Sequence, residues 1–385
     1  MRLLEVTHRY PPALGGVEIQ VEAIARGAAA RGDCVTVVTT DLARDRPLER
    51  LSPSEAPSSV VVRRHRAVRW IPAPHGLGIV APGMAADLLR LPADVVHAHA
   101  FGMAPTWLAA LARRVRNGSL VIETHFDSGR GTPGWRAYAR AVTRLTLHRA
   151  DRVVAHTRLE SDLLVSLGVP AEKLVRISNG LDLSEFSGFG VARPGVGPPT
   201  ILFVGRLAVA QKGLVPLLRA FASLPHELSS ARLRLVGQDW GGRTVVSQLA
   251  RSLGVADRVE LAGAVPRAQL LQEYARADVF VLPSLFDCTP VVLMEAMAAG
   301  LPIVATRVGG VEEVVTEGLD SVLCAPNDPG GLASSLSGLL SDPAKRRRLG
   351  EAGQHGAQRF SWAQVLPKWF SLFDSLDGQQ GQAGG

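Results

Sequence analysis

The sequence predicts an α/β protein built from two doubly wound parallel sheets, each in its own domain. The first observation is that short β-branched and apolar runs alternate with segments of helical length, which is typical of parallel strands joined by helices. The second is the length of 385 residues, which suffices for two domains that each bury a core. The third is a stretch rich in Gly and Pro, residues 187–199, which divides the chain near its middle.

The first domain is placed at residues 1–190. Its expected strands are Leu3–Thr7, Val35–Thr40, Val60–Arg63, Val95–Ala98, Leu120–Thr124 and Val153–Ala155. These runs are rich in Val, Ile and Thr, which favour the pleated conformation. Because segments of helical length lie between them, we expect crossover connections and a parallel sheet.

The second domain is placed at residues 196–360. Its expected strands are Ile201–Val204, Leu233–Val236, Val259–Leu261, Val279–Leu282 and Ile303–Ala305. Phe360-Ser361-Trp362 opens a last amphipathic helix, residues 361–377, with Ser361 as its expected N-cap.

Composition places the chain among soluble globular proteins, with 46% hydrophobic and 20% charged residues. The first residues enter a strand pattern without the apolar core of a signal peptide, and no run of about 18 uncharged apolar residues occurs. Cys34, Cys288 and Cys324 are scattered and show neither a disulfide framework nor metal-ligand spacing. We therefore expect a cytoplasmic protein.

The formal net charge is +7, and arginine carries most of the positive charge. A basic balance suits anionic partners such as nucleotide sugars or acidic lipid surfaces. Nucleic acid is not expected, because there is no zinc-finger spacing and only 5% of the residues are aromatic. Arg136, Arg140 and Arg144 recur at helical spacing and would share one helix face. That face is either solvated or in contact with an anionic membrane.

Two acids flank a turn that follows the expected strand Val279–Leu282. Asp287 and Glu295 are eight residues apart, and the segment between them turns into a helix whose first turn we expect to contain Glu295. Open α/β sheets bind ligands beyond the carboxyl ends of their strands, and a carboxylate there suits a sugar or ribose hydroxyl. The alternative is an ordinary strand-to-helix turn with a solvated aspartate.

Two cations follow the first strand of the second domain. Arg206 comes directly after Gly205, and Lys212 lies six residues further on. Two fixed cations at one strand end are able to clamp a diphosphate and to stabilise the charge that develops as it leaves. The alternative is an exposed pair of basic side chains beside a loop.

Glycines and histidines mark strand ends in the first domain. Gly15 and Gly16 precede the first expected helix, where they form either an ordinary turn or a close approach to a ligand. His97, His99 and His125 lie at two further strand ends, where a histidine is more often structural than catalytic. We find no third ligand at a spacing that supports a metal site.

These motifs together resemble the retaining glycosyltransferase family 4. Asp287 and Glu295, followed by Ala-Met-Ala-Ala-Gly and by Gly309-Gly310, resemble the family's Glu-x7-Glu signature, with aspartate in place of its first glutamate. Gly205-Arg206-Leu and Lys212-Gly213 resemble its Gly-Arg-Leu and Lys-Gly motif, with one residue more between them. Gly15-Gly16 resembles its N-terminal glycine loop.

The resemblance implies the GT-B architecture, in which two Rossmann-like domains face a cleft and a C-terminal helix crosses back to the first domain. It further implies an enzyme that moves a sugar from a nucleoside diphosphate sugar and retains the anomeric configuration. In this comparison Arg206 and Lys212 bind the leaving diphosphate, Glu295 holds the ribose hydroxyls, and Asp287 and His125 face the donor sugar. The donor-binding residues implied are Gly16, Gly205, Val265, Cys288, Thr289, Pro290, Val291 and Glu295.

The donor is expected to be a UDP-sugar, with GDP-mannose next. Aspartate is one methylene shorter than glutamate, which removes roughly 1.5 Å of reach, so Asp287 bears on which donor sugar is held. No Asp-x-Asp occurs in the chain, so we expect no cofactor and no metal in the reaction.

The acceptor is expected to carry a hydroxyl and to be a lipid, a cell-wall or polysaccharide sugar, or a natural-product core. Residues 41–58 and 70–83 are expected to shape its site. The alternatives are a nucleotide-sugar epimerase, a sugar phosphorylase or synthase of the same architecture, and a non-catalytic protein that binds nucleotide sugars. The Asp287 departure supports the last of these.

Overall fold

The computed structural model describes residues 1–13, 15–45, 48–50, 59–69, 79–115, 117–125, 135–190 and 197–383. The chain divides into two compact units. The first unit comprises Met1–Gly180 with Trp362–Gly385, and the second comprises Leu181–Ser361. No helix among these described residues is both long and apolar enough to cross a membrane.

The boundary between the units lies earlier than the Gly- and Pro-rich stretch that we expected to separate the domains. Residues 181–190, which we assigned to the first domain, belong to the second unit. The reason is local packing, because Leu181 and Phe186 are buried in the core of the second unit. Residues 191–196 of the expected linker lie outside the described residues.

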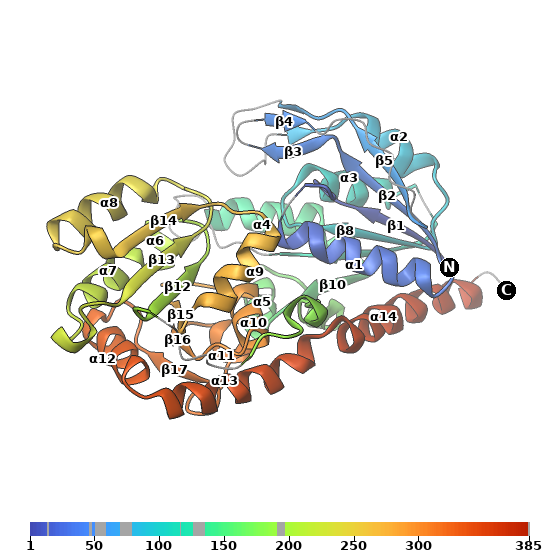
Figure 1. Ribbon diagram of the computed structural model, residues 1–385. Coiled ribbons are helices and arrows are strands. Elements are labelled where there is room, and N and C mark those ends of the chain that lie inside the picture. Colours follow the sequence, from blue (N-terminus) through green and yellow to red (C-terminus); the bar gives the residue numbers. More distant parts are fainter. Residues whose placement is uncertain are drawn as a thin grey trace. The chain divides into compact units, whose positions relative to one another are not determined.

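The first unit is organised around a seven-stranded parallel sheet with the order β11-β10-β9-β8-β1-β2-β5 (Figure 1). Its strands are β1 (Arg2–Val6), β2 (Cys34–Thr40), β5 (Val61–His65), β8 (Val95–His99), β9 (Ser119–Glu123), β10 (Arg152–Ala155) and β11 (Leu174–Arg176). Two short antiparallel pairs lie outside this sheet: β3 (Leu42–Asp45) with β4 (Leu48–Arg50), and β6 (Val68–Arg69) with β7 (Ile79–Val80).

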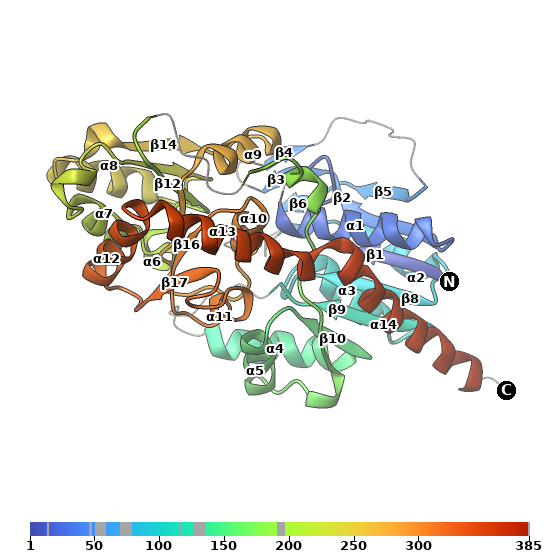
Figure 2. The ribbon, with the colours of Figure 1, turned by 60° about the horizontal axis from the view of Figure 1, so that its bottom comes forward.

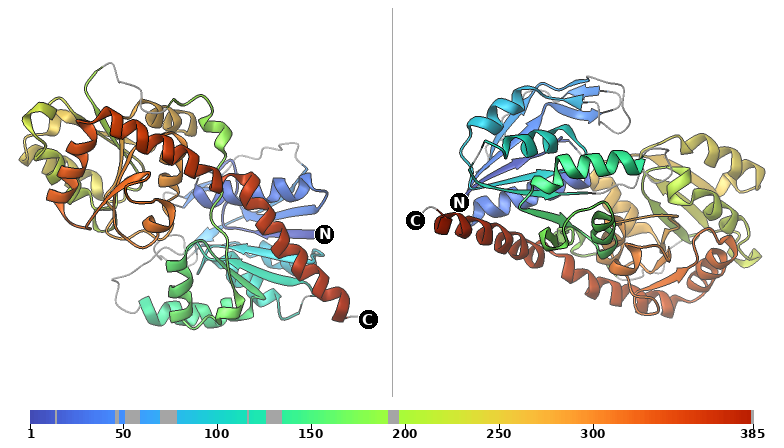
Figure 3. Two further views of the ribbon diagram at one scale, coloured as in Figure 1. Left: turned by 90° about the horizontal axis from the view of Figure 1, so that it is seen from below. Right: turned by 180° about the vertical axis from the view of Figure 1, so that it is seen from behind.

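Helices pack on both faces of this sheet (Figure 3). They are α1 (Gly16–Ala30), α2 (Gly83–Arg90), α3 (Ala104–Ala112), α4 (Trp135–Leu145), α5 (Arg158–Ser166) and α14 (Trp362–Ala383), with 3-10 turns at Leu147–Arg149 and Ala171–Lys173. One core cluster involves α2 and α3 and the other involves α1 and α14. The sheet is therefore doubly wound, as the sequence predicts.

The C-terminal helix α14 packs against α1 and β8 in the first unit (Figure 2). Val365, Trp369, Phe373 and Leu376 recur at helical spacing, and all four are buried in one core cluster. This stripe explains why a helix that follows the second unit in sequence returns to the first. The predicted return of the C-terminal helix is confirmed.

The second unit contains a six-stranded parallel sheet with the order β14-β13-β12-β15-β16-β17. Its strands are β12 (Thr200–Val204), β13 (Arg232–Val236), β14 (Val259–Gly263), β15 (Val279–Leu282), β16 (Ile303–Thr306) and β17 (Ser321–Cys324). Its helices are α6 (Val209–Lys212), α7 (Leu214–Ala222), α8 (Gly242–Ser252), α9 (Arg267–Arg276), α10 (Val291–Ala298), α11 (Val311–Val314), α12 (Pro329–Leu340) and α13 (Pro343–Ala357). The 3-10 turns are Leu183–Phe186, His226–Leu228, Ala256–Arg258 and Gln358–Phe360.

Every run that we expected as a strand lies in one of the two parallel sheets. The edge strands β11 and β17 were not expected. Central strands such as β8, β9 and β15 are buried along their whole length, which is typical of a sheet covered on both faces. The fold class is therefore confirmed as α/β with two Rossmann-like domains.

Candidate functional site

The acidic turn of the second unit follows β15 and leads into α10. This helix begins at Val291, so Glu295 lies one turn beyond the helix start and not in the first turn as we expected. Gly310 packs against the turn, since its N–H donates to the carbonyl of Asp287 at 3.1 Å. A Cβ at this position would collide with the carbonyl oxygen of Cys288. Glycine at 310 therefore allows the turn to lie against the loop that follows β16.

Lys212 and Asp287 form a buried ion pair at the carboxyl ends of the neighbouring strands β12 and β15. Nζ of Lys212 lies 2.5 Å from Oδ2 of Asp287, and the hydroxyl of Ser284 donates to the same oxygen at 3.1 Å. Gly213 ends α6 in the left-handed conformation with φ +60, and a Cβ there would collide with the carbonyl of Pro283. Lys212 is the last residue of the short helix α6.

Arg206 lies in the loop after β12, directly after Gly205, and Lys212 is the last residue of the short helix α6 that follows this loop. Its guanidinium stacks over the ring of Trp240, with 4.4 Å between the carbon Cζ and the ring centroid. Trp240 comes from the loop between β13 and α8 and is partly exposed. Sequence reasoning found Arg206 but not Trp240. A tryptophan in a loop that follows a β-strand is the signal that could have indicated it.

Both oxygens of Glu295 already have protein partners. Oε1 pairs with Nη1 of Arg267, and Oε2 accepts a hydrogen bond of 2.7 Å from the hydroxyl of Tyr274. Burial and the neighbouring carboxylate raise the pKa of Tyr274 well above its ordinary value, so this hydroxyl keeps its proton. A carboxylate oxygen accepts more than one hydrogen bond, so Glu295 retains acceptor capacity.

Arg267 links Glu295 to Glu185. Its Nη2 lies 2.5 Å from Oε2 of Glu185, and its Nε lies 3.2 Å from both oxygens of that carboxylate. Burial would lower the pKa of Arg267, but the hydrogen bonds and charges of Glu185 and Glu295 raise it. Arg267 is the first residue of α9 and follows Val265 and Pro266. Sequence reasoning missed Arg267 and Tyr274, because their partners are distant in sequence.

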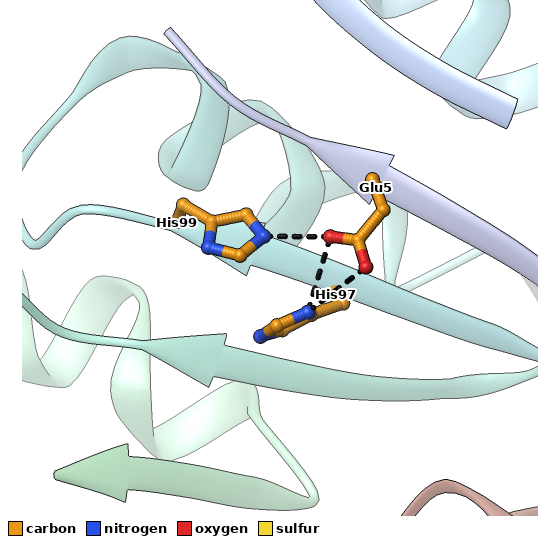
Figure 4. Close-up of side chains that lie close together, drawn as sticks. All are labelled: Glu5, His97 and His99. Carbon is orange, nitrogen blue, oxygen red and sulfur yellow. Dashed lines mark hydrogen bonds and ion pairs between the residues drawn. The ribbon is translucent and has the colours of Figure 1, made fainter. Parts of the chain in front are cut away.

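A second group of ionisable side chains lies in the first unit, at the carboxyl ends of β1, β8 and β9. The parallel register pairs Glu5 with His97 and His99 with Glu123. Oε2 of Glu5 lies 2.6 Å from Nε2 of His99 and 3.1 Å from Nδ1 of His97 (Figure 4). Glu5, His97, His99 and Glu123 are all fully buried.

Glu123 is the hub of this group. Its Oε2 lies 2.6 Å from Nδ1 of His99 and 3.2 Å from Nε2 of His125, and its Oε1 lies 3.2 Å from Nε2 of His156. Gln20 of α1 donates its amide to Oε1. Burial alone would raise the pKa of Glu123, but the surrounding histidines, His125 first, hold it well below its ordinary value.

The pKa values of the histidines move in opposite directions. Burial would lower the pKa of His99, but its hydrogen bonds to Glu123 and Glu5 raise the pKa to about 9. For His125 burial is the stronger influence, and its pKa is lowered despite the charge of Glu123. His125 also adopts a left-handed backbone conformation with φ +43, which is uncommon for a residue other than glycine.

Proximity alone makes this cluster a candidate metal site. We expected no third ligand beside the histidines, but Glu5 and Glu123 complete two groups whose donor atoms lie within 4.8 Å of one another. Around tetrahedral zinc the ligand atoms would be roughly 3.3 Å apart, given metal–ligand bonds of about 2.0 Å. The contacts of 2.6 Å on both sides of His99 are hydrogen-bond distances instead. Protons, and not a cation, fit these contacts.

Gly16, a predicted donor-binding residue, begins α1 and is exposed. A Cβ built at Gly16 would meet no described atom within 4 Å, so packing among the described residues does not require glycine there. In the second unit, Val265 packs against the core cluster and Cys288 is buried. Arg206, Lys212, Asp287 and Glu295 thus all lie in the second unit, whereas Gly16 and His125 lie in the first.

Comparison with known proteins gives two family matches, which together cover most of the chain. Residues 14–185 match the family described as Glycosyltransferase Family 4, and residues 191–356 match the family described as Glycosyl transferases group 1. Both descriptions define a glycosyltransferase, the class to which the two parallel-sheet domains and the paired cations and acids also point.

Curated relatives match over nearly the whole chain. The chain is 30% identical to D-inositol 3-phosphate glycosyltransferase of Thermobifida fusca over 378 residues, which cover 91% of this chain and 86% of that protein. It is 29% identical to glycogen synthase of Mycobacterium tuberculosis over 397 residues, which cover 95% of this chain and 92% of that protein. The chain therefore belongs to glycosyltransferase family 4.

Solved structures of low sequence identity share the fold. Sucrose-phosphate synthase from Thermosynechococcus elongatus matches with a TM-score of 0.80 and 23% identity, covering 98% of this chain and 99% of that one. Anabaena Alr3699/HepE in complex with UDP and glucose matches with a TM-score of 0.75 and 21% identity, covering 97% and 100%. The protein is thus a glycosyltransferase with the GT-B fold.

Proposed function

We propose that this enzyme transfers a sugar from a nucleoside diphosphate sugar to a hydroxyl acceptor, with retention of the anomeric configuration and without a metal ion. The observation that carries the proposal is the ion pair of Lys212 and Asp287 at the carboxyl ends of the neighbouring strands β12 and β15. Arg206 follows β12, and Glu295 lies in the helix that follows the turn after β15. Ligands of such sheets bind beyond the carboxyl ends of the strands.

In the proposed reaction the bond between the anomeric carbon and the phosphate oxygen breaks, and the acceptor oxygen attacks the same face of the sugar. The acceptor proton passes to the leaving phosphate, so no separate base is required. Arg206 and Lys212 stabilise the negative charge that develops on that phosphate. Among the described residues we identify no pair of carboxylates acting as acid and nucleophile, which is how retaining glycosidases work.

The ion pair between Lys212 and Asp287 suits this chemistry. A bare carboxylate would repel a diphosphate, but Lys212 neutralises Asp287 before the donor binds. Asp287 accepts a hydrogen bond from a hydroxyl of the donor sugar. Lys212 donates hydrogen bonds both to this carboxylate and to the donor phosphate. The aspartate, shorter than the glutamate of the family motif, is held by a lysine that lies one residue further along the chain than in most members.

Glu295 binds the ribose, with its orientation set by Arg267 and Tyr274. We infer a UDP-sugar as donor, with GDP-mannose as the second candidate, because Anabaena Alr3699/HepE, which shares the fold, is in complex with UDP-glucose. The roles of Gly16 beside the donor phosphates and of His125 beside the donor sugar rest on the family resemblance.

The experiment is a calorimetric titration of UDP-sugars and GDP-sugars into the wild-type protein and Arg206→Ala, with a chelator present. We expect one nucleotide class to bind and the substitution to weaken it at least about tenfold, since a hydrogen bond to a charged group contributes about 1.5–3 kcal/mol. Retention is then read from the anomeric coupling constant of the product once an acceptor is found. Activity that a chelator abolishes and magnesium restores would contradict the metal-independent reaction.

A non-catalytic nucleotide-sugar-binding protein remains the second candidate, because Lys212 is already neutralised by Asp287. The two candidates differ in Asp287→Glu. The non-catalytic function is correct if the wild-type protein binds a donor without transferring or hydrolysing it, whereas Asp287→Glu transfers or hydrolyses that donor. If wild type is active and Asp287→Glu changes only the preferred sugar, the transferase is correct.

We further propose that the enzyme is cytoplasmic and contacts an anionic membrane through α4, which would favour a lipid acceptor. Arg140 and Arg144 are exposed on this helix together with Tyr138 and Leu145. Exposed apolar side chains beside arginines suit an anionic interface. Sedimentation with vesicles of anionic lipid, but not of neutral lipid, is expected for wild type, and Arg140→Glu/Arg144→Glu should abolish it. Equal sedimentation of both proteins would contradict the proposed contact.

A further inference from the structure

The short segment that opens the second unit carries an acid that no motif of the sequence indicated. Residues Leu183–Phe186 form a 3-10 turn, and the carboxylate of Asp182 caps this turn by accepting a hydrogen bond of 2.9 Å from the backbone N–H of Ser184. Phe186 is buried in the core of the second unit, whereas the side chain of Glu185 keeps 31% exposure. The cap and the buried ring hold the turn, so Glu185 has a fixed position in it.

Glu185 pairs with one side of the Arg267 guanidinium. Nε of Arg267 lies 3.2 Å from both oxygens of Glu185, and Nη2 lies 2.5 Å from Oε2. A bidentate pair of this kind is strong and directional, because two N–H groups of the planar guanidinium meet one carboxylate. The remaining nitrogen, Nη1, donates to Oε1 of Glu295. Arg267 therefore gives two nitrogens to Glu185 and one to Glu295.

This division leaves Glu295 with acceptor capacity. An ionised carboxylate has about four lone-pair sites on its two oxygens. Oε1 accepts from Arg267, and Oε2 accepts from the hydroxyl of Tyr274 at 2.7 Å, so among the described residues each oxygen uses one site. One further site on each of two neighbouring oxygens matches two neighbouring hydroxyl donors. The 2′ and 3′ hydroxyls of a ribose have this arrangement.

Arg267 would compete with such a pair of hydroxyls if Glu185 did not hold it. A guanidinium favours a bidentate pair with one carboxylate. Without the charge of Glu185, the carboxylate that Arg267 already contacts is that of Glu295. A second N–H of Arg267 would then turn to Glu295 and occupy an acceptor site there. Arginine stays protonated in proteins, so this competition does not depend on pH.

We propose that Glu185 is a positioning residue that sets the selectivity of the donor site for ribose, because it holds Arg267 and thereby leaves Glu295 acceptor sites for two hydroxyls. The inference rests on the proposed function, in which Glu295 binds the ribose of the donor. Glu185 acts through Arg267 and does not itself contact the donor. Its loss should therefore affect ligands that carry the 2′ hydroxyl and not the diphosphate alone.

The test is a calorimetric comparison of UDP with 2′-deoxy-UDP, or of GDP with 2′-deoxy-GDP if that class binds. Inorganic pyrophosphate serves as a ligand without ribose. Wild type should bind the ribonucleotide at least about tenfold more tightly than its 2′-deoxy form, since the latter lacks one hydrogen bond to a charged group. Glu185→Gln should reduce this ratio of affinities at least about threefold, as expected for a weakened hydrogen bond, and should leave the affinity for pyrophosphate unchanged. An unchanged ratio in Glu185→Gln would overturn the proposal.

Glu273→Gln is the matched control. Glu273 also lies on α9 and also forms a bidentate pair, with Nε and Nη2 of Arg234 at 2.7 and 2.6 Å from its two oxygens. The other carboxylate that Arg234 contacts is Glu260, which is exposed. Because Glu273 is more buried than Glu185, at 8% exposure against 31%, its loss should disturb α9 at least as much. The selectivity for ribose should nevertheless stay as in wild type. An equal fall in Glu273→Gln would indicate a general loosening of α9 and would refute the positioning role.

A double variant tests whether Glu185 acts through Arg267. In Arg267→Met the guanidinium is absent, so adding Glu185→Gln should cause no further change in selectivity, and the two effects should not be additive. Additive losses would show that Glu185 does not act through Arg267. If Glu185→Gln does not fold, Glu185→Asp takes its place. Aspartate keeps the charge but withdraws the carboxylate by roughly 1.5 Å, so the ratio should fall in the same direction, and an unchanged ratio would again refute the proposal.

The wild-type measurements separate this inference from the proposed function. If wild type binds neither nucleotide, the proposed function fails and the inference fails with it. If wild type binds both the ribonucleotide and its 2′-deoxy form equally well, the donor is bound without selection for ribose and only the inference fails. If wild type prefers the ribonucleotide and Glu185→Gln shows the same preference, the proposed function likewise stands and Glu185 has no positioning role.

Discussion

The two units pair acids with cations in different ways at the carboxyl ends of their sheets. In the second unit the cations are a lysine, Lys212, and an arginine, Arg267, and the side chains of Asp287 and Glu295 retain 10% and 9% exposure. In the first unit the cation is His99, which is fully buried between Glu5 and Glu123. Because solvent reaches the charged side chains of the second unit, each is able to replace a contact to its protein partner with a contact to a ligand. A sealed histidine cluster holds protons and acts as a scaffold.

The largest effect is expected from Lys212→Met, which leaves Asp287 buried without its cation. Removing one partner of a buried ion pair costs about 3–5 kcal/mol. The free energy of unfolding from urea denaturation should fall by that amount. The double variant Lys212→Met/Asp287→Asn should recover much of the loss, because no unpaired charge remains. A double variant that is no more stable than Lys212→Met would contradict the pairing.

The histidine cluster should instead make stability depend on pH. His99 has an ordinary pKa of about 6.5 when unfolded and a raised pKa of about 9 when folded. Its contribution, on the order of 3 kcal/mol, is present in full below about pH 6.5 and is lost as the pH rises through 9. Hydrogen exchange of β8 peptides should show this slope in wild type and not in His99→Gln. An equal slope in both proteins would contradict the assignment of His99 as the cation of this cluster.

A smaller effect is expected from Tyr274→Phe, which removes one hydrogen bond from Glu295. Hydrogen bonds to charged groups contribute about 1.5–3 kcal/mol. Donor affinity should therefore fall by roughly ten- to a hundredfold. The control is Tyr138→Phe on α4, because Tyr138 is an exposed residue of the first unit. Equal donor affinities for Tyr274→Phe and wild type would show that the hydroxyl does not orient Glu295.

The smallest effect is expected from Trp240→Leu, which removes the ring beneath Arg206. An exposed cation–π contact contributes about 0.5–1 kcal/mol, so nucleoside diphosphate affinity should change about two- to fivefold, as isothermal calorimetry would detect. A loss as large as that of Arg206→Ala would mean that Trp240 contacts the ligand directly.

The site of the second unit could largely be predicted from the sequence because it is local. Arg206 and Lys212 both follow β12 closely in sequence, and Asp287 and Glu295 both follow β15, so each pair shows a readable spacing. Strand alternation likewise predicted both parallel sheets. What the spacing could not show is that Lys212 pairs with Asp287, since that contact depends on the neighbouring strands β12 and β15.

The histidine cluster could not be predicted for the same reason. Its members lie in the strands β1, β8 and β9 or directly after β9 and β10, and only the order of the strands in the sheet brings them together. Glu5 lies inside an apolar run, where a charged residue at an inward position is the one available signal. Arg267 and Glu185 also meet only through the fold.

The most direct test of the contrast between the units compares a nucleoside diphosphate with its nucleoside. In calorimetric titrations of UDP and uridine, or of GDP and guanosine if that class binds, Arg206→Ala should weaken the diphosphate at least about tenfold and leave the nucleoside unchanged. Glu295→Gln should weaken both, and Glu123→Gln, in the first unit, should weaken neither. Two results would contradict this account: equal weakening of both ligands by Arg206→Ala, or loss of binding in Glu123→Gln. Either result would mean that the diphosphate does not bind beside Arg206, Lys212 and Asp287 in the second unit.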